Sequence, residues 1–193
     1  MRRAFTLIEA MLLLFVIVLI PAWILFILWM PSKPPSRYVC LSNLKQIGSG
    51  FLQYTQDYGG KFPPSRVKSS TGWADVLQPY IKSRSVFQCP ATQNSVSPLT
   101  DYFYNRRVSR VPIGKLRFIS QTILVGEGDD DRPTWVSLSQ MPFSWPITEH
   151  SPARRHSDGA NYLFVDGHAK WLEPSKVKPT LSRKDLSPTF AIR

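Results

Sequence analysis

Residues 5–32 read FTLIEAMLLLFVIVLIPAWILFILWMPS, and Glu9 is the only charged residue among them. At about 1.5 Å per helical residue, the apolar run Ala10–Met30 reaches the roughly 30 Å that span the hydrocarbon core of a bilayer. The basic pair Arg2-Arg3 precedes this run, with no acidic residue before Glu9, which places the N-terminus in the cytoplasm. The sequence therefore predicts one transmembrane helix over residues 5–30, with the rest of the chain exported.

Glu9 requires a partner in this setting. A carboxylate costs about 2.5–3.5 kcal/mol at mid-membrane on insertion scales, and less near the interface. Cleavage between Ala4 and Phe5 would create an ammonium group at Phe5 that can pair with Glu9 of a neighbouring subunit. A secretory signal peptide does not fit, because its apolar region has only 7–15 residues and ends in a small-x-small site. A plain single-pass anchor explains the length of the segment but not Glu9.

The remaining composition limits the exported part. Beyond the apolar segment about 160 residues remain, enough for one compact domain. The formal net charge is +11, so the surface can meet anionic lipid, anionic polysaccharide or DNA, although a solvated charged tail is the plainer interpretation. Cys40 and Cys89 can form a disulfide outside the inner membrane or stay as buried free thiols. They do not form a CxxC pattern, which argues against zinc.

The order of local patterns predicts an α+β fold. Prolines between residues 31 and 36 break the first helix, and helical periodicity resumes at Tyr38 and ends at Gly59-Gly60. Asp166-Gly167 is a strong hairpin signal between two extended runs. The shorter elements that we predict are a helix over 73–81, an extended piece over 86–90, strands over 102–104 and 122–126, and hairpin strands over 161–165 and 168–172.

Four side chains near the C-terminus invite a chemical interpretation: His156, Asp158, Asp166 and His168. A His–Asp pair can do acid–base work, and two histidines with carboxylates can ligate a transition metal. A structural role is favoured, because the first position of a two-residue hairpin turn favours Asp at positive φ. No Ser-His-Asp spacing, nucleophile elbow or phosphate loop is present, so an enzyme is the least supported class.

A second acidic feature is the tract Asp129-Asp130-Asp131, with Glu127 nearby. These carboxylates can supply oxygen ligands to calcium, the one cofactor that the sequence suggests. The tract lacks the spaced ligand order of an EF-hand, so a solvated acidic loop is the plainer interpretation.

The N-terminus, from Arg2-Arg3 through Ala4 and Phe5-Thr6-Leu7-Ile8 to Glu9, resembles the leader of type IV prepilins. Type IV pilins and type II secretion pseudopilins share this leader. The resemblance implies a leader of residues 1–4, cut by a prepilin peptidase after Ala4, and N-methylation of the new first residue, Phe5. The family usually has Gly before the cut, where this chain has Ala4.

Two later stretches resemble bacterial prepilin-type proteins. The first starts at Cys40-Leu41-Ser42-Asn43-Leu44 and continues to Phe62-Pro63-Pro64. In the second, nine residues separate His156 from Asp166-Gly167, the spacing of the H-X9-DG motif in that family. Some secretion pseudopilins also bind calcium in a loop beside the sheet. The prolines at 31–35 depart from the family, in which the N-terminal helix usually continues toward the cysteine.

We therefore predict a pilin-like α+β protein. Its globular domain, residues 37–173, would contain a second amphipathic helix and a small antiparallel β-sheet with a C-terminal hairpin, followed by a basic flexible tail over 174–193. The implied function is a structural subunit of a type II secretion or type IV pilus-like filament, held in the inner (plasma) membrane before assembly. Its partners would be the prepilin peptidase and other subunits. The alternatives are a pilus-linked receptor for DNA or another anionic polymer, and a single-pass exported protein that does not polymerise.

Overall fold

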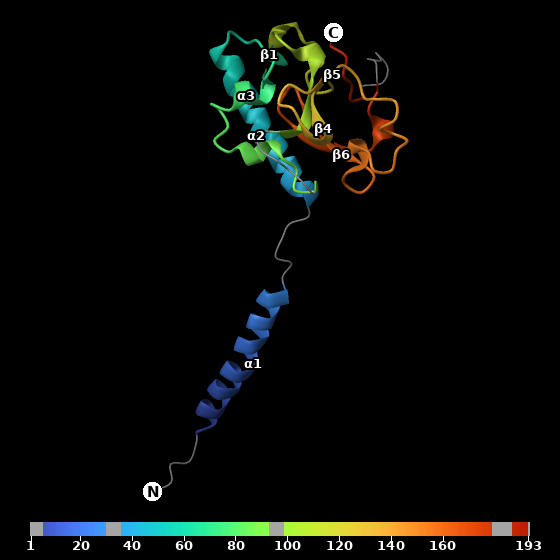
Figure 1. Cartoon of the computed structure of the whole chain (residues 1–193). Coiled ribbons are helices and arrows are strands. Elements are labelled where there is room, and N and C mark those ends of the chain that lie inside the picture. The colour runs from blue at the N-terminus through green and yellow to red at the C-terminus, as the bar shows by residue number, and fades with distance from the viewer. Residues whose placement is uncertain (1–5, 30–35, 93–98, 179–186, 193) are drawn as a thin grey trace. The chain divides into compact units, whose positions relative to one another are not determined.

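Two units make up the chain, Met1–Pro34 and Pro35–Arg193, and the second has an α+β fold (Figure 1). The structure, a computed structural model, describes residues 6–29, 36–92, 99–178 and 187–192, and only the backbone of residues 27–29, 130 and 131. Most of the predicted proline-rich break therefore lies outside the described residues.

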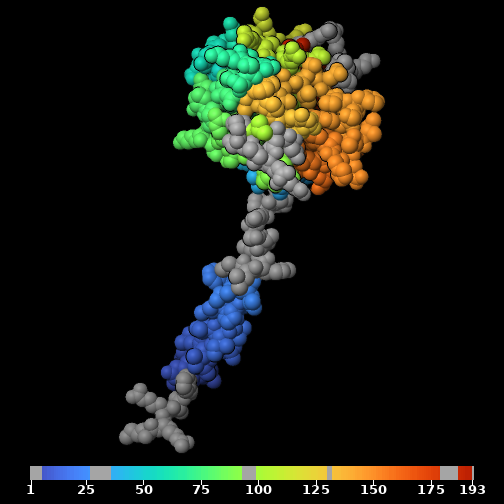
Figure 2. All heavy atoms as spheres, viewed as in Figure 1, coloured from blue at the N-terminus to red at the C-terminus, as the bar shows by residue number. Residues whose placement is uncertain are grey.

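The first unit contains helix α1 (Leu7–Trp29), which is apolar on all sides. Every side chain of this helix whose burial is described is exposed, and Figure 2 shows one face of the helix in blue. Such a helix is unfavourable in water, because each large apolar side chain left exposed forfeits about 1.5–3 kcal/mol of burial. The stretch Leu7–Phe26 is long and apolar enough to cross a membrane, as the sequence predicts. The helix continues through Pro21.

Helix α2 (Ser36–Asp57) begins the second unit, two residues before the predicted start. Its buried residues recur at helical spacing and include Cys40, Leu44, Ile47 and Phe51. Gly48 allows the helix to lie close to the sheet, since a Cβ there would sit 2.9 Å from Leu163 Cδ1. The apolar face of α2 thus packs against the sheet and forms the larger of two cores.

The sheet has five strands in the order β5-β3-β4-β6-β7. Their bounds are β3 (Thr100–Asn105), β4 (Ile123–Arg132), β5 (Ser137–Leu138), β6 (Ala160–Phe164) and β7 (Ala169–Leu172). All neighbours are antiparallel except β3 and β5, which are parallel. The prediction of an antiparallel sheet is therefore wrong at one edge. Pro133 has no N–H to continue the β4 ladder, and the chain crosses to the outer edge of β3.

Several short elements precede β3. They are β1 (Arg66–Lys68), β2 (Thr71–Gly72), α3 (Trp73–Leu77) and a 3₁₀ helix (Arg84–Phe87). The extended piece predicted over 86–90 is wrong at its start, because the Gln88 amide bonds the Ser85 carbonyl in a 3₁₀ turn. That turn directs the side chains of Val86 and Phe87 into the core.

The end of the chain also differs from the prediction. A flexible tail was expected over 174–193, but Phe190 is fully buried and stacks on Phe103 at 5.5 Å between ring centroids. The amide of Thr189 donates to the carbonyl of Gln121 at 2.9 Å, and the amide of Ile123 donates to the carbonyl of Thr189 at 2.8 Å. Phe190 therefore belongs to the second core, which covers the face of the sheet opposite α2, and Ile192 packs against the first core.

Candidate functional site

The predicted cleavage residues, Ala4 and Phe5, lie outside the described residues. Glu9 is described, and it forms a capping box with Thr6 at the start of α1. The Thr6 amide and hydroxyl donate to Glu9 Oε2 at 3.0 and 2.9 Å, and the Glu9 amide donates to Thr6 Oγ1 at 3.3 Å. The spacing T-x-x-E before an apolar run is the sequence signature of this arrangement. Glu9 thus has a local partner, a role missing from the sequence prediction, and its pairing with a neighbouring subunit stays a prediction.

Cys40 of α2 and Cys89 are joined by a disulfide with Cα atoms 5.3 Å apart. Both residues are fully buried. Of the two possibilities that the sequence leaves open, the structure shows the disulfide. The bond connects α2 to the segment that leads into β3, across 49 residues of sequence.

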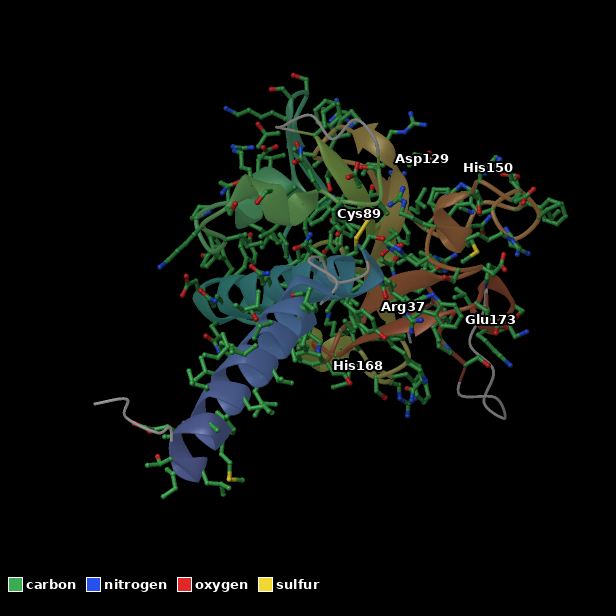
Figure 3. All side chains as sticks on the ribbon, turned by 90° about the horizontal axis from the view of Figure 1, so that it is seen from below. Arg37, Cys89, Asp129, His150, His168 and Glu173 are labelled. Carbon is green, nitrogen blue, oxygen red and sulfur yellow. A yellow bond between two sulfur atoms is a disulfide. The ribbon has the colours of Figure 1, made fainter. Side chains whose placement is uncertain are left out.

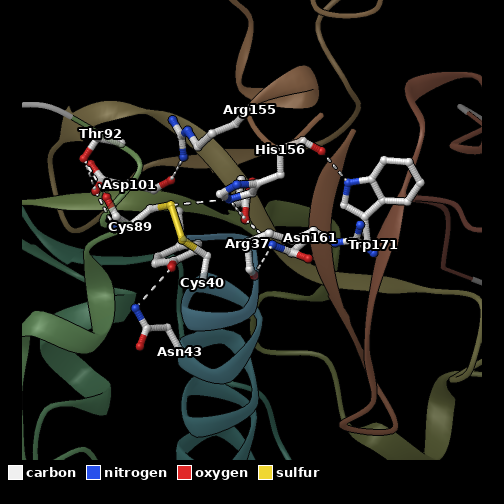
Figure 4. A network of polar contacts seen from close by, with 12 residues as sticks. Arg37, Cys40, Asn43, Cys89, Thr92, Asp101, Arg155, His156, Asn161 and Trp171 are labelled. Carbon is white, nitrogen blue, oxygen red and sulfur yellow. Dashed lines mark hydrogen bonds and ion pairs between the residues drawn. A yellow bond between two sulfur atoms is a disulfide. The ribbon is translucent and has the colours of Figure 1, made fainter. Parts of the chain in front are cut away.

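A buried polar cluster surrounds this disulfide (Figure 4). His156 Nε2 lies 3.5 Å from Cys89 Sγ and 3.1 Å from Glu127 Oε1. Asn161 Nδ2 donates to the same Glu127 oxygen at 2.7 Å and also to the Arg37 carbonyl at 3.2 Å. His156 is 4% exposed, and Glu127 and Asn161 are fully buried. The other carboxylate oxygen, Glu127 Oε2, has no hydrogen-bond partner among the described residues.

Local backbone geometry places His156 in this cluster. Its amide donates to the Gly159 carbonyl at 2.8 Å, and its carbonyl accepts from Trp171 Nε1 at 2.8 Å. Ser157 and Asp158 have positive φ values of 53° and 63°, which complete the tight turn into β6. Gly159 has no space for a Cβ, which would lie 2.4 Å from the Trp171 ring. The turn therefore holds the imidazole inside the domain.

The two ends of the H-X9-DG spacing are separated in space by strand β6. Asp166 and Gly167 lie in the β6–β7 turn, where Asp166 Oδ1 accepts from the His168 amide at 3.2 Å and lies 2.6 Å from His168 Nδ1. Figure 3 shows His168 apart from the Cys89 disulfide. The metal set of His156, Asp158, Asp166 and His168 is therefore not assembled. Asp158 is largely exposed and pairs with Arg154 at 3.1 Å.

The hairpin is confirmed, but its turn differs from the predicted one. Only Gly167 has a positive φ in this turn, at 91°, and Asp166 does not. The amide of Gly167 donates to the Phe164 carbonyl at 2.9 Å, and the amide of Phe164 donates to the His168 carbonyl at 2.9 Å. This is a longer turn that ends in a glycine bulge. Asp166 contributes through its side chain rather than through an unusual backbone conformation.

The proposed calcium ligands do not form one site among the described side chains. Glu127 is buried beside His156, whereas Asp129 is partly exposed and pairs with Arg132 at 3.0 Å. The tract belongs to β4, so the acidic loop is a wrong prediction. The side chains of Asp130 and Asp131 lie outside the described residues.

Two buried tyrosines adjoin the cluster. Burial raises the pKa of Tyr102 and Tyr162 above the usual value, and the nearby Glu127 carboxylate raises both further. The pKa of each tyrosine in the folded domain lies above the unfolded value of about 10. Their contribution to the free energy of unfolding is therefore fully present below pH 10. That contribution is lost as the pH rises through the folded pKa.

We expect Tyr102 and Tyr162 to ionise only as the domain unfolds in alkali. Phenolate absorbance followed together with circular dichroism would show their ionisation in the cooperative unfolding step. Tyr162→Phe is a mild control, since the hydroxyl of Tyr162 has no hydrogen-bond partner in the described part of the chain. In this variant one phenol fewer should ionise during the unfolding transition. Ionisation of both tyrosines of the wild type while the domain is still folded would contradict the expectation.

No family model, curated protein or solved structure matches this chain. The geometry alone defines two candidate sites: the capped N-terminus of α1, and the buried cluster around the disulfide, which we call the Cys–His–Glu cluster (Cys40, Cys89, Glu127 and His156). All four ligand-type atoms of this cluster lie within 4.8 Å of one another.

Proposed function

We propose that this chain is a structural subunit, a pseudopilin or pilin-like protein, of a type II secretion or type IV pilus-like filament. Before assembly α1 holds it in the inner membrane with the N-terminus in the cytoplasm, and the domain of residues 36–192 is exported. During assembly the apolar helices of several subunits bundle, and Glu9 of one pairs with the Phe5 ammonium of the next. The prepilin peptidase produces that ammonium by cleavage after Ala4. The proposal assigns no catalytic residue.

The observation that carries the proposal is the exposed apolar surface of α1 together with its N-terminal carboxylate. The helix offers apolar side chains on every side, which suits either lipid or a bundle of like helices. The buried disulfide supports export, because such bonds form and persist in oxidising compartments outside the cytosol.

A second candidate is a membrane-anchored exported domain that does not polymerise. The capping box favours this candidate, because the amide and hydroxyl of Thr6 donate hydrogen bonds to the Glu9 carboxylate without a neighbouring subunit. A receptor for DNA or another anionic polymer is supported only by the net charge of +11.

Intact mass of the membrane-extracted protein tests the proposal. We expect the mass of a chain that begins at Phe5 and carries one methyl group. A chain that retains Met1–Ala4 would contradict the filament role and favour the plain anchor. Ala4→Gly provides a matched comparison, since it restores the residue usual in prepilins and should increase the processed fraction.

A further inference from the structure

We propose that the thiol form of this protein binds one Zn²⁺ at the Cys–His–Glu cluster. The ligands would be the two sulfurs of Cys40 and Cys89, Nε2 of His156 and a carboxylate oxygen of Glu127. This inference is independent of the filament role, because it depends only on the domain of residues 36–192.

Cys40 and Cys89 lack a CxxC pattern, which argues against zinc in the sequence, but the fold brings together four donor atoms of the types that zinc binds. Zinc takes four ligands from Cys, His, Asp and Glu in a tetrahedron, and bond lengths of about 2.0–2.3 Å place neighbouring donors about 3.3–3.8 Å apart. His156 Nε2 already lies 3.1 Å from Glu127 Oε1 and 3.5 Å from Cys89 Sγ. The four donors lie within 4.8 Å of one another, so small side-chain movements complete the set once the sulfurs separate.

An unpartnered donor atom points independently to a ligand. Glu127 is fully buried, and its Oε2 has no hydrogen-bond partner among the described residues. A buried carboxylate oxygen without a partner is costly, and a bound cation removes that cost. Asn161 donates to Glu127 Oε1 at 2.7 Å and so holds the carboxylate in place, as supporting residues do around metal ligands.

The chemistry balances as follows. A phosphine reductant cleaves the Cys40–Cys89 bond: phosphorus is oxidised to the phosphine oxide with an oxygen from water, and the two sulfurs each gain a proton. Zinc then displaces both protons to solvent, since the thiolate is the ligand. His156 binds as neutral imidazole. All four residues are buried, which is typical of a closed structural site rather than a catalytic one.

Zinc retention by the full chain in detergent micelles tests the proposal. The chain is unfolded with a phosphine reductant, refolded without oxygen in the presence of Zn²⁺, and desalted. We expect about one zinc per chain in the thiol form and none in the disulfide form, with Co²⁺ giving the spectrum of a tetrahedral thiolate site. Zinc retained equally by both forms, zinc absent from both, or cobalt without a thiolate spectrum would each overturn the proposal.

Variants of the non-sulfur ligands separate the site from ordinary thiol binding. Glu127→Gln and His156→Gln should each weaken zinc affinity at least about tenfold, because each removes a ligand. His150→Gln is the matched control, since His150 is exposed and should leave the affinity unchanged. Where a variant does not refold, the wild-type comparison of thiol and disulfide forms still decides. Unchanged affinity in both folded ligand variants would contradict the proposal.

Discussion

Glu9→Gln is expected to remain in the membrane but to be lost from filaments by roughly a hundredfold or more. The substitution preserves the capping box, because Gln also accepts a hydrogen bond at this position, but it removes the charge. In the proposed filament it would leave the Phe5 ammonium of the neighbour without a counter-charge in an apolar core. Removing one partner of a buried ion pair costs about 3–5 kcal/mol, which corresponds to that loss. Quantitative immunodetection of sheared filaments and membranes measures it.

Two further variants separate capping from pairing. Thr6→Val removes the hydroxyl that bonds Glu9 Oε2 and accepts from the Glu9 amide, while the carboxylate stays. We expect this variant to be incorporated nearly as well as the wild type, since loss of a cap costs only about 1 kcal/mol. Glu9→Ala removes both functions, so it cannot distinguish them. Normal incorporation of Glu9→Gln would restrict Glu9 to helix capping and support the non-polymerising anchor.

Removal of the disulfide is expected to destabilise the domain of residues 36–192 by about 4 kcal/mol on the chain-entropy account, given the loop it closes. Cys40→Ala with Cys89→Ala is the informative variant, because a single substitution leaves a free thiol. For a domain of this size the loss corresponds to a melting temperature lower by roughly 8–16 °C. Near-ultraviolet circular dichroism of the full chain in detergent, compared with the oxidised wild type, measures the change.

Zinc adds a second comparison to this experiment. The reduced wild type should lose a similar stability and regain part of it when zinc is added, whereas the double alanine variant should not respond. An unchanged melting temperature in the double variant would mean that packing of α2 against the sheet holds the domain without the bond.

Local patterns predicted the elements whose signals are complete within a few residues. The apolar segment is predicted from its own residues, because length and hydrophobicity suffice to recognise a candidate membrane span. The same is true of α2 and of the β6–β7 hairpin, where spacing and the Asp-Gly pair are explicit. The Thr6–Glu9 capping box is also visible in the sequence as T-x-x-E, although the sequence prediction gives the Glu9 carboxylate only a role in subunit pairing.

The wrong predictions share a physical cause. Polar and proline-containing stretches read as loops when considered alone, but partners distant in the chain ordered them. The acidic tract after Glu127 belongs to β4 because pairing with β3 resumes beyond it, at Thr100 and Arg132, after a shift in register. Phe190 is buried because the ring of Phe103 is available on the open face of the sheet.

The sequence by itself determined the membrane-compatible segment, the α+β class and the hairpin, since each depends on neighbouring residues. Only the tertiary structure decided that Cys40 bonds Cys89 and that His156 contacts Glu127 rather than Asp166. The packing of α2 brings Cys40 to Cys89, and the pairing of β4 with β6 brings Glu127 near the turn that holds His156. Burial then removes water as a hydrogen-bond partner, so the polar atoms must bond to one another or to a ligand. That requirement is invisible in residue spacing, and it creates the Cys–His–Glu cluster.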